Sequence, residues 1–215
     1  MLRRIGWGIG DQALSSLTNF ALGLIVARSV DTTALGAFSF AFLAYAVGLG
    51  VNRALASQPL VIRYSATAPN QWVSGVAAAG GVTLWVGALS ALIAATIAAW
   101  SSGTLRDAFL ALALVMPGLL YQDAWRYAFF AENRATFAFL NDLAWTVVMV
   151  PALWASLVLW PGSVGGPVLA WGGAATVAGL LGFAQTRILP RPWGARSWLR
   201  EHWDLVPRYV GEFAT

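Results

Sequence analysis

Residues 64–105 read YSATAPNQWVSGVAAAGGVTLWVGALSALIAATIAAWSSGTL and contain no charged side chain over 42 positions. Two further uncharged runs have 21 residues between Asp31 and Arg53 and 44 residues between Asp142 and Arg187. A helix needs about 20 apolar residues to cross the hydrocarbon core of a bilayer. The two longest runs therefore predict more than one helical element each, and the expected class is a polytopic membrane protein.

The composition of the whole chain supports this class. Of 215 residues, 59% are hydrophobic and 10% are charged, whereas a soluble domain has about 45–50% apolar and about 25% charged residues. This argues against a soluble globular domain, a disordered chain and a nucleic-acid-binding module, so we expect no nucleic-acid partner. The chain has no cysteine, which excludes thiol chemistry, disulfides and cysteine-ligated metal.

The expected fold is an all-α bundle of six transmembrane helices. Strands of a membrane barrel alternate apolar and polar residues, and these runs are apolar on all sides. We divide the chain into a six-helix lobe over 1–188, a cytoplasmic interfacial linker over 189–207 and the start of a truncated seventh helix over 208–215. Charged residues and Pro-Gly breaks place the six helices at about 7–29, 33–62, 72–100, 105–131, 134–160 and 166–187.

The distribution of arginine predicts the orientation. With a cytoplasmic N-terminus, the outer side has only Arg28 and Arg106, and such a bias marks the cytoplasmic side of membrane proteins. We therefore expect a multi-pass protein of the plasma or inner membrane. The inner side collects nine arginines, which are Arg3, Arg4, Arg63, Arg126, Arg134, Arg187, Arg191, Arg196 and Arg200.

Polar residues inside the predicted helices are candidate functional residues, because they are costly in a bilayer. In the first helix, Asp11, Ser15 and Asn19 recur every four residues and so share one face. Counting along the helices places Asp11, Arg53, Asp123, Arg126 and Asp142 in the cytoplasmic half, which predicts a hydrated cavity open to the cytoplasm. The remaining candidates on the second, fourth and fifth helices are Asn52, Arg53, Gln58, Asp123, Arg126 and Asp142.

Simpler interpretations of these residues stay open. Asp11 and Arg53 could form a pair that only ties two helices together. Asp123 and Arg126 are three residues apart and could pair on one helix, or Arg126 could extend to the inner headgroups. A guanidinium in a cavity suits a phosphate, because it can grip two phosphate oxygens at once.

Motifs for enzymatic chemistry are missing from the sequence. His202 is the single histidine, and it has no second metal ligand nearby. Gly6, Gly8 and Gly10 resemble a glycine loop, but no strand precedes them as a nucleotide site would require. We therefore expect no enzyme activity, no cofactor and no metal.

Three stretches resemble a known family of transporters. The segment from Asp11 to Arg28 resembles the first helix of polysaccharide-export flippases of the multidrug/oligosaccharidyl-lipid/polysaccharide superfamily. Leu35-Gly-Ala-Phe38 and Arg53-Ala-Leu-Ala-Ser-Gln-Pro-Leu60 are similar to its second helix, and Tyr121–Trp145 is similar to the junction of its fourth and fifth helices.

The resemblance implies one lobe of a two-lobe transporter that works by alternating access. The implied cargo is a polyprenyl-diphosphate-linked oligosaccharide, with Arg53 as the best match for a diphosphate ligand and Arg28 and Arg126 behind it. Family members have about twice as many helices, so a second six-helix lobe and membrane lipids are the other implied partners. The alternatives are a drug or cation antiporter of the same fold, favoured by Asp11 and Asp142, and a membrane scaffold that transports nothing.

Overall fold

A computed structural model of the chain describes residues 2–65 and 67–207, and the side chains of these residues except 2–9 and 11. Within that part every regular element is helical. The predicted seventh helix over 208–215 lies outside the described residues. The elements are α1 (Leu2–Ser29), α2 (Thr32–Asn52), the π-helix η1 (Arg53–Ser57), α3 (Gln58–Tyr64), α4 (Pro69–Ala99), α5 (Gly103–Ala131), α6 (Ala135–Leu159), α7 (Gly165–Thr186), the 3₁₀ turn η2 (Pro192–Gly194) and α8 (Ala195–His202).

Five helical segments are long and apolar enough to cross a membrane. They are Thr32–Tyr64, which joins α2, η1 and α3, and the helices α4, α5, α6 and α7. Each of these segments corresponds closely to a predicted span. The first predicted span is also helical, as α1, but that it crosses the membrane stays a prediction.

Local sequence signals explain where the helices begin and end. The Asp31 carboxylate accepts a hydrogen bond of 2.8 Å from the backbone N–H of Ala34 and so caps α2. Pro69 begins α4, where a proline costs no hydrogen bond. Asn133 and Gly162 have positive φ angles of 62° and 79° in the turns that follow α5 and α6, so these sharp connections place successive helices side by side.

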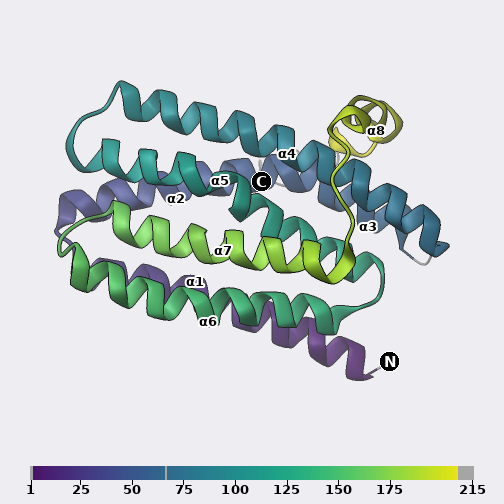
Figure 1. The fold of residues 1–215 in the computed structure, drawn as a ribbon, viewed down its shortest axis with the longest axis horizontal. Coiled ribbons are helices and arrows are strands. Elements are labelled where there is room, and N and C mark those ends of the chain that lie inside the picture. The colour runs from purple at the N-terminus through teal and green to yellow at the C-terminus, as the bar shows by residue number, and fades with distance from the viewer. Residues whose placement is uncertain (1, 66, 208–215) are drawn as a thin grey trace.

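The long helices run up and down in one bundle (Figure 1). In this view α4 lies along one edge, α6 lies along the other, and α5 and α7 run between them, while α2 and α1 pass behind. The central helix is α5, which packs against α2, α3, α4, α6 and α7. In contrast, α1 packs mainly on α6 and hardly touches α2.

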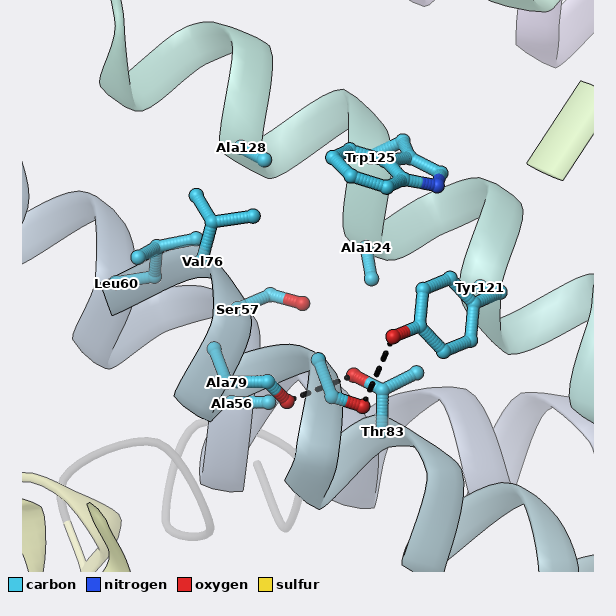
Figure 2. A pocket seen from close by; sticks show the side chains of 11 residues that line it. Ala56, Ser57, Leu60, Val76, Ala79, Thr83, Tyr121, Ala124, Trp125 and Ala128 are labelled. Atoms are coloured by element: carbon cyan, nitrogen blue, oxygen red, sulfur yellow. Dashed lines mark hydrogen bonds between the residues drawn. The ribbon is translucent and has the colours of Figure 1, made fainter. Parts of the chain in front are cut away.

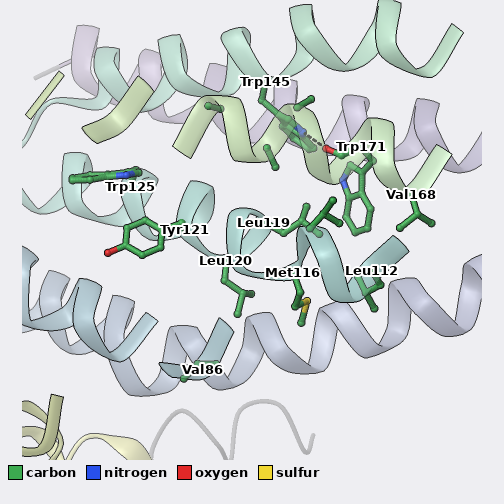
Figure 3. Packing of buried hydrophobic residues seen from close by; sticks show 14 of the residues in the cluster. Val86, Leu112, Met116, Leu119, Leu120, Tyr121, Trp125, Trp145, Val168 and Trp171 are labelled. Atoms are coloured by element: carbon green, nitrogen blue, oxygen red, sulfur yellow. Dashed lines mark hydrogen bonds between the residues drawn. The ribbon is translucent and has the colours of Figure 1, made fainter. Parts of the chain in front are cut away.

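The core lies where α5 meets α4 and α7 (Figure 3). The Trp145 indole donates a hydrogen bond of 3.2 Å to the carbonyl of Trp171, which joins α6 to α7. A Cβ on Gly172 would lie 2.2 Å from a methyl carbon of Val115, so α5 and α7 can approach this closely only with glycine there.

The outer surface of the bundle is apolar. Every long helix exposes large hydrophobic side chains, such as Phe20 (71%), Leu114 (76%) and Leu180 (61%). The same bundle buries charged and amide side chains, including Asp123, Arg126 and Asp142. Apolar residues outside and polar residues inside suit a bundle surrounded by lipid, so the structure describes a membrane protein.

Candidate functional site: a polar cluster between four helices

The candidate site is a cluster of charged residues that come from different helices. Arg53 of η1 makes two contacts with Asp123 of α5, with Nη2–Oδ1 at 2.6 Å and Nε–Oδ2 at 3.0 Å. This is the two-nitrogen geometry in which a guanidinium and a carboxylate match best. The pair joins the second predicted span to the central helix of the bundle.

A second pair lies directly beside the first. The Nε of Arg126 is 3.3 Å from Oδ2 of Asp142 on α6, and its Nη1 is 3.6 Å from Oδ1 of Asp123. The Gln122 amide donates a hydrogen bond of 2.6 Å to Oδ1 of Asp142. We call Arg53, Asp123, Arg126 and Asp142 the polar cluster. Within it, both carboxylates contact arginine.

The first helix also reaches the polar cluster. The Oε1 of Gln12 on α1 lies 3.5 Å from Nη2 of Arg126. The residues of the cluster lie on η1, α5 and α6, and α1 contacts them through Gln12. These elements correspond to the four predicted spans that carry polar residues. The side chain of Asp11, the neighbouring candidate, lies outside the described part of the chain.

Burial differs sharply among the members of the cluster. The side chains of Asp142, Asp123 and Arg126 are 0%, 3% and 8% exposed, whereas that of Arg53 is 27% exposed. Arg53 also lies over the ring of Tyr127, with its guanidinium carbon 5.4 Å from the ring centroid. Arg53 is thus the cationic member that a ligand could reach.

The local backbone at Arg53 is unusual. Residues 53–57 form a π-helix, and the N–H of Gln58 bonds to the carbonyl of Arg53 across this wider turn. The second residue of α3 is Pro59, which has no N–H for the helix. Single π turns inside α-helices are frequent at functional sites, and this one carries the most exposed arginine of the polar cluster.

The opposite face of α5 is apolar. Tyr121, Trp125 and Ala128 line a small cavity together with Ser57 and residues of α4 (Figure 2). The cavity offers about 20 Å³ to the centre of a water molecule, which is enough for about one water. Because side chains one residue apart on a helix point in different directions, α5 separates this cavity from the polar cluster.

The structure brings together Arg53, Asp123, Arg126 and Asp142, which are all among the predicted site residues, and that they line a hydrated cavity or bind a substrate stays a prediction. The alternative pair of Asp11 and Arg53 also stays a prediction, because the side chain of Asp11 lies outside the described part of the chain. The alternative that Arg126 extends to the headgroups is wrong, since this side chain is 8% exposed and contacts both carboxylates. The predicted pair of Asp123 and Arg126 on one helix is present as the longest contact of the cluster.

Other predicted site residues lie apart from these contacts. The half-buried Asn19 donates a hydrogen bond of 3.0 Å to the carbonyl of Ser15. Asn52 is fully buried, and its amide has no hydrogen-bond partner among the described residues. Gln58 is half-buried beside η1. Arg28 is exposed near the opposite end of α1, roughly 24 Å along the helix from Gln12.

Sequence reasoning missed Gln12 as a contact of the polar cluster. It lies one position outside the predicted polar stripe of α1, and its partner Arg126 is 114 residues away. Gln122 and Tyr127 carried a weak signal, since both flank the Asp123–Arg126 pair on α5. No local sequence pattern predicts the contact of Trp198 with η1, in which the indole donates a hydrogen bond to the backbone carbonyl of Leu55.

Comparisons with known proteins add no assignment. No protein-family model, no curated protein and no solved structure matches the chain. Among the described residues, no group of three histidine, cysteine, aspartate or glutamate side chains could hold a metal ion. The argument on function therefore depends on the polar cluster and its surroundings.

Proposed function

We propose that this chain is a six-helix lobe of a membrane transporter, a flippase for polyprenyl-diphosphate-linked oligosaccharides. In this proposal the lobe works with a second six-helix lobe, and the two rock around a shared cavity to give alternating access. The cargo moves from the cytoplasmic to the outer leaflet. The support comes from the family resemblance of the sequence and from the chemistry of the polar cluster.

The single observation that carries the proposal is the set of hydrogen bonds and the exposure of the Arg53 guanidinium. Asp123 holds Nε and Nη2, whereas Nη1 has no hydrogen-bond partner among the described residues. The side chain is 27% exposed within a segment apolar enough to span a membrane. Asp123 thus holds the guanidinium in place and leaves Nη1 to bind a ligand. This suits a diphosphate, because phosphate oxygens accept hydrogen bonds well from a planar guanidinium.

The depth of the polar cluster also supports a lipid headgroup as ligand. Asp123 is 20 residues from the first residue of α5, or about 30 Å at 1.5 Å per residue. That distance is close to the thickness of a hydrocarbon core, about 30 Å. A ligand with its diphosphate at this level would leave its prenyl chain in the bilayer.

An exchanger of cationic drugs has weaker support. It needs a carboxylate that can take up the cation or a proton, and Asp123 and Asp142 both contact arginine. A site for cations would have to displace one of these arginines first. The arrangement of the described charges thus favours an anionic cargo.

A binding measurement tests this function. The chain would be placed in lipid nanodiscs, with farnesyl diphosphate as a short polyprenyl diphosphate and farnesyl monophosphate as the comparison ligand. We expect Arg53→Ala to weaken diphosphate binding at least tenfold, because one good charge-assisted contact is worth about 1.5–3 kcal/mol. The control Arg106→Ala changes an exposed arginine at the other end of the bundle and should leave the affinity within twofold.

Two results would contradict the proposal. One is equal affinity of the wild-type chain and Arg53→Ala for farnesyl diphosphate. The other is a wild-type chain that binds neither farnesyl ligand, which would favour a membrane scaffold. Inorganic diphosphate serves as a third ligand, and tighter binding of this ion than of farnesyl diphosphate would argue against a lipid-linked cargo.

A further inference from the structure

The π-helix η1 contains a backbone carbonyl that cannot form the ordinary α-helical hydrogen bond. In an α-helix the carbonyl of Leu55 would accept a hydrogen bond from the N–H four residues later. That residue is Pro59, which has no N–H. This carbonyl therefore depends on the wider π turn or on a donor from outside the helix.

Trp198 of α8 supplies a donor from outside the helix. Its indole Nε1 donates a hydrogen bond of 2.9 Å to the carbonyl of Leu55, although the two residues are 143 positions apart. The Trp198 side chain is among the largest fully buried ones, with 2% exposure. Its ring stacks on Tyr64 of α3 at 5.5 Å and on His202 at 4.0 Å between centroids, so two neighbouring rings hold the indole in place.

Other contacts hold the rest of the α8 segment, which we define as residues 188–207. The N–H of Arg191 bonds to the carbonyl of Ala77 at 2.7 Å, and the Trp85 indole bonds to the carbonyl of Pro192 at 3.2 Å. Arg63 contacts the Asp204 carboxylate at 2.7 Å. In Figure 1 α8 is seen nearly end-on, so it crosses the direction of the bundle beside α3 and α4. These contacts reach α3 and α4, whereas Trp198 reaches η1.

We propose that Trp198 is a positioning residue for Arg53. The Trp198–Leu55 hydrogen bond fixes the backbone of η1 two residues after Arg53 and thereby sets the direction from which Arg53 meets Asp123. When α8 undocks, the carbonyl of Leu55 loses this donor and η1 can shift, which moves Arg53 out of its present geometry. The part of this inference that concerns ligand affinity rests on the function proposed above.

The closeness of the two contacts on one short segment supports this coupling. Leu55 is two residues after Arg53, and both lie within the five residues of η1. Arg53 lies at the first position of η1, so a shift of the backbone at Leu55 carries Arg53 with it and moves it against α5.

The first test needs no ligand. Hydrogen exchange of the chain in nanodiscs would be followed by mass spectrometry for peptides that cover residues 50–64. Trp198→Phe keeps a stacking ring and removes the indole donor, and we expect exchange in these peptides to rise at least threefold. The control is Trp193→Phe, because Trp193 belongs to the same segment and is 81% exposed, and its exchange should match the wild type. Unchanged exchange in Trp198→Phe would overturn the proposal.

The second test uses Pro59 to remove the need for Trp198. Pro59→Ala restores an N–H that can bond to the carbonyl of Leu55 within the helix. We expect Trp198→Phe to weaken farnesyl diphosphate binding about 3- to 10-fold in the wild-type background, as for one lost hydrogen bond. In the Pro59→Ala background the same change should have less than a twofold effect. A merely structural role of the indole would give equal losses in both backgrounds and would overturn the proposal.

The two tests separate this inference from the proposed function. If hydrogen exchange responds to Trp198→Phe but no variant binds farnesyl diphosphate, the coupling of α8 to η1 stands and the flippase proposal fails. If Arg53→Ala abolishes binding while Trp198→Phe changes neither exchange nor affinity, the flippase proposal stands and the positioning role fails.

Discussion

Two arginines of the same spanning segment, ten residues apart, each pair with an aspartate from another part of the chain, in very different surroundings. Arg53 meets Asp123 with two nitrogens, and the side chains are 27% and 3% exposed. Arg63 meets Asp204 with the single nitrogen Nη2, and the side chains are 39% and 59% exposed. The contact distances are similar, so distance alone does not separate the two pairs.

Burial gives the two pairs different physical roles. Water competes for the Arg63–Asp204 pair, and exposed pairs of this kind contribute about 0–1 kcal/mol. The Arg53–Asp123 pair has given up most of the hydration of its carboxylate, and a buried pair often gains little net stability from its own attraction. A buried pair is therefore weak support for stability, and the Nη1 of Arg53, which has no hydrogen-bond partner in the described part of the chain, gives the pair a different potential use.

The largest expected effect is the loss of Asp123. Asp123→Ala leaves Arg53 without its carboxylate and removes one of the carboxylates that contact Arg126. Because removal of one partner leaves an uncompensated charge, we expect a loss of about 3–5 kcal/mol in the free energy of unfolding. Equilibrium unfolding of the chain in detergent by increasing SDS would measure this loss.

A double variant separates stability from ligand binding. Arg53→Met with Asp123→Leu replaces both charges by apolar groups of similar volume, and such exchanges are often neutral or stabilising. It should recover most of the stability that Asp123→Ala loses and should still fail to bind farnesyl diphosphate. If Asp123→Ala alone were as stable as the wild type, the contrast between buried and exposed pairs would be wrong.

Loss of the exposed Arg63–Asp204 pair should lower the free energy of unfolding much less. We expect Asp204→Ala to cost less than about 1 kcal/mol in low salt, and screening should reduce this cost further at about 1 M salt. The same SDS titration at two salt concentrations measures both values. A cost as large as that of Asp123→Ala would show that docking of the α8 segment, and not solvent exposure, governs the strength of this pair.

Much of the fold could be predicted because it depends on local patterns. The uncharged run from residue 64 to 105 and the break at Pro161-Gly162 place helices within a few residues of those observed. The π-helix η1 was not predictable in this way, since a proline in a long apolar helix predicts only a kink. The contact of η1 with Trp198 was not predictable either, because the two lie 143 residues apart in sequence.

The candidate site was predictable in composition but not in pairing. Polar groups are costly inside a bilayer, so the sequence alone identifies a set of candidate site residues, which includes Arg53, Asp123, Arg126 and Asp142. Which carboxylate meets which guanidinium depends on helix rotation, because a shift of one residue on α5 turns a side chain by about 100°. That rotation follows from packing of glycines such as Gly172 against Val115, and the sequence shows only that such contacts are possible.

A third pair, Arg134–Glu132 at 3.2 Å, lies between the two extremes, with side chains 53% and 23% exposed. Partial burial raises the pKa of Glu132 above its usual 4.5, and the charge of Arg134 opposes that rise. A raised pKa in the folded chain means that Glu132 favours folding below about pH 4.5 and loses this contribution as the pH rises through the folded value.

Replacement of Glu132 should reveal this small pH dependence. Glu132→Gln stays neutral, so the unfolding free energy of the wild type relative to this variant should fall between about pH 4 and pH 7. Arg134→Gln removes the opposing charge, so the pKa of Glu132 should rise further and the fall should extend to higher pH. Thermal unfolding in detergent over this range measures both differences. If the unfolding free energy of the wild type relative to Glu132→Gln rose with pH, the attraction of Arg134 would outweigh the burial of Glu132. The difference between buried and exposed pairs would then not extend to half-buried pairs.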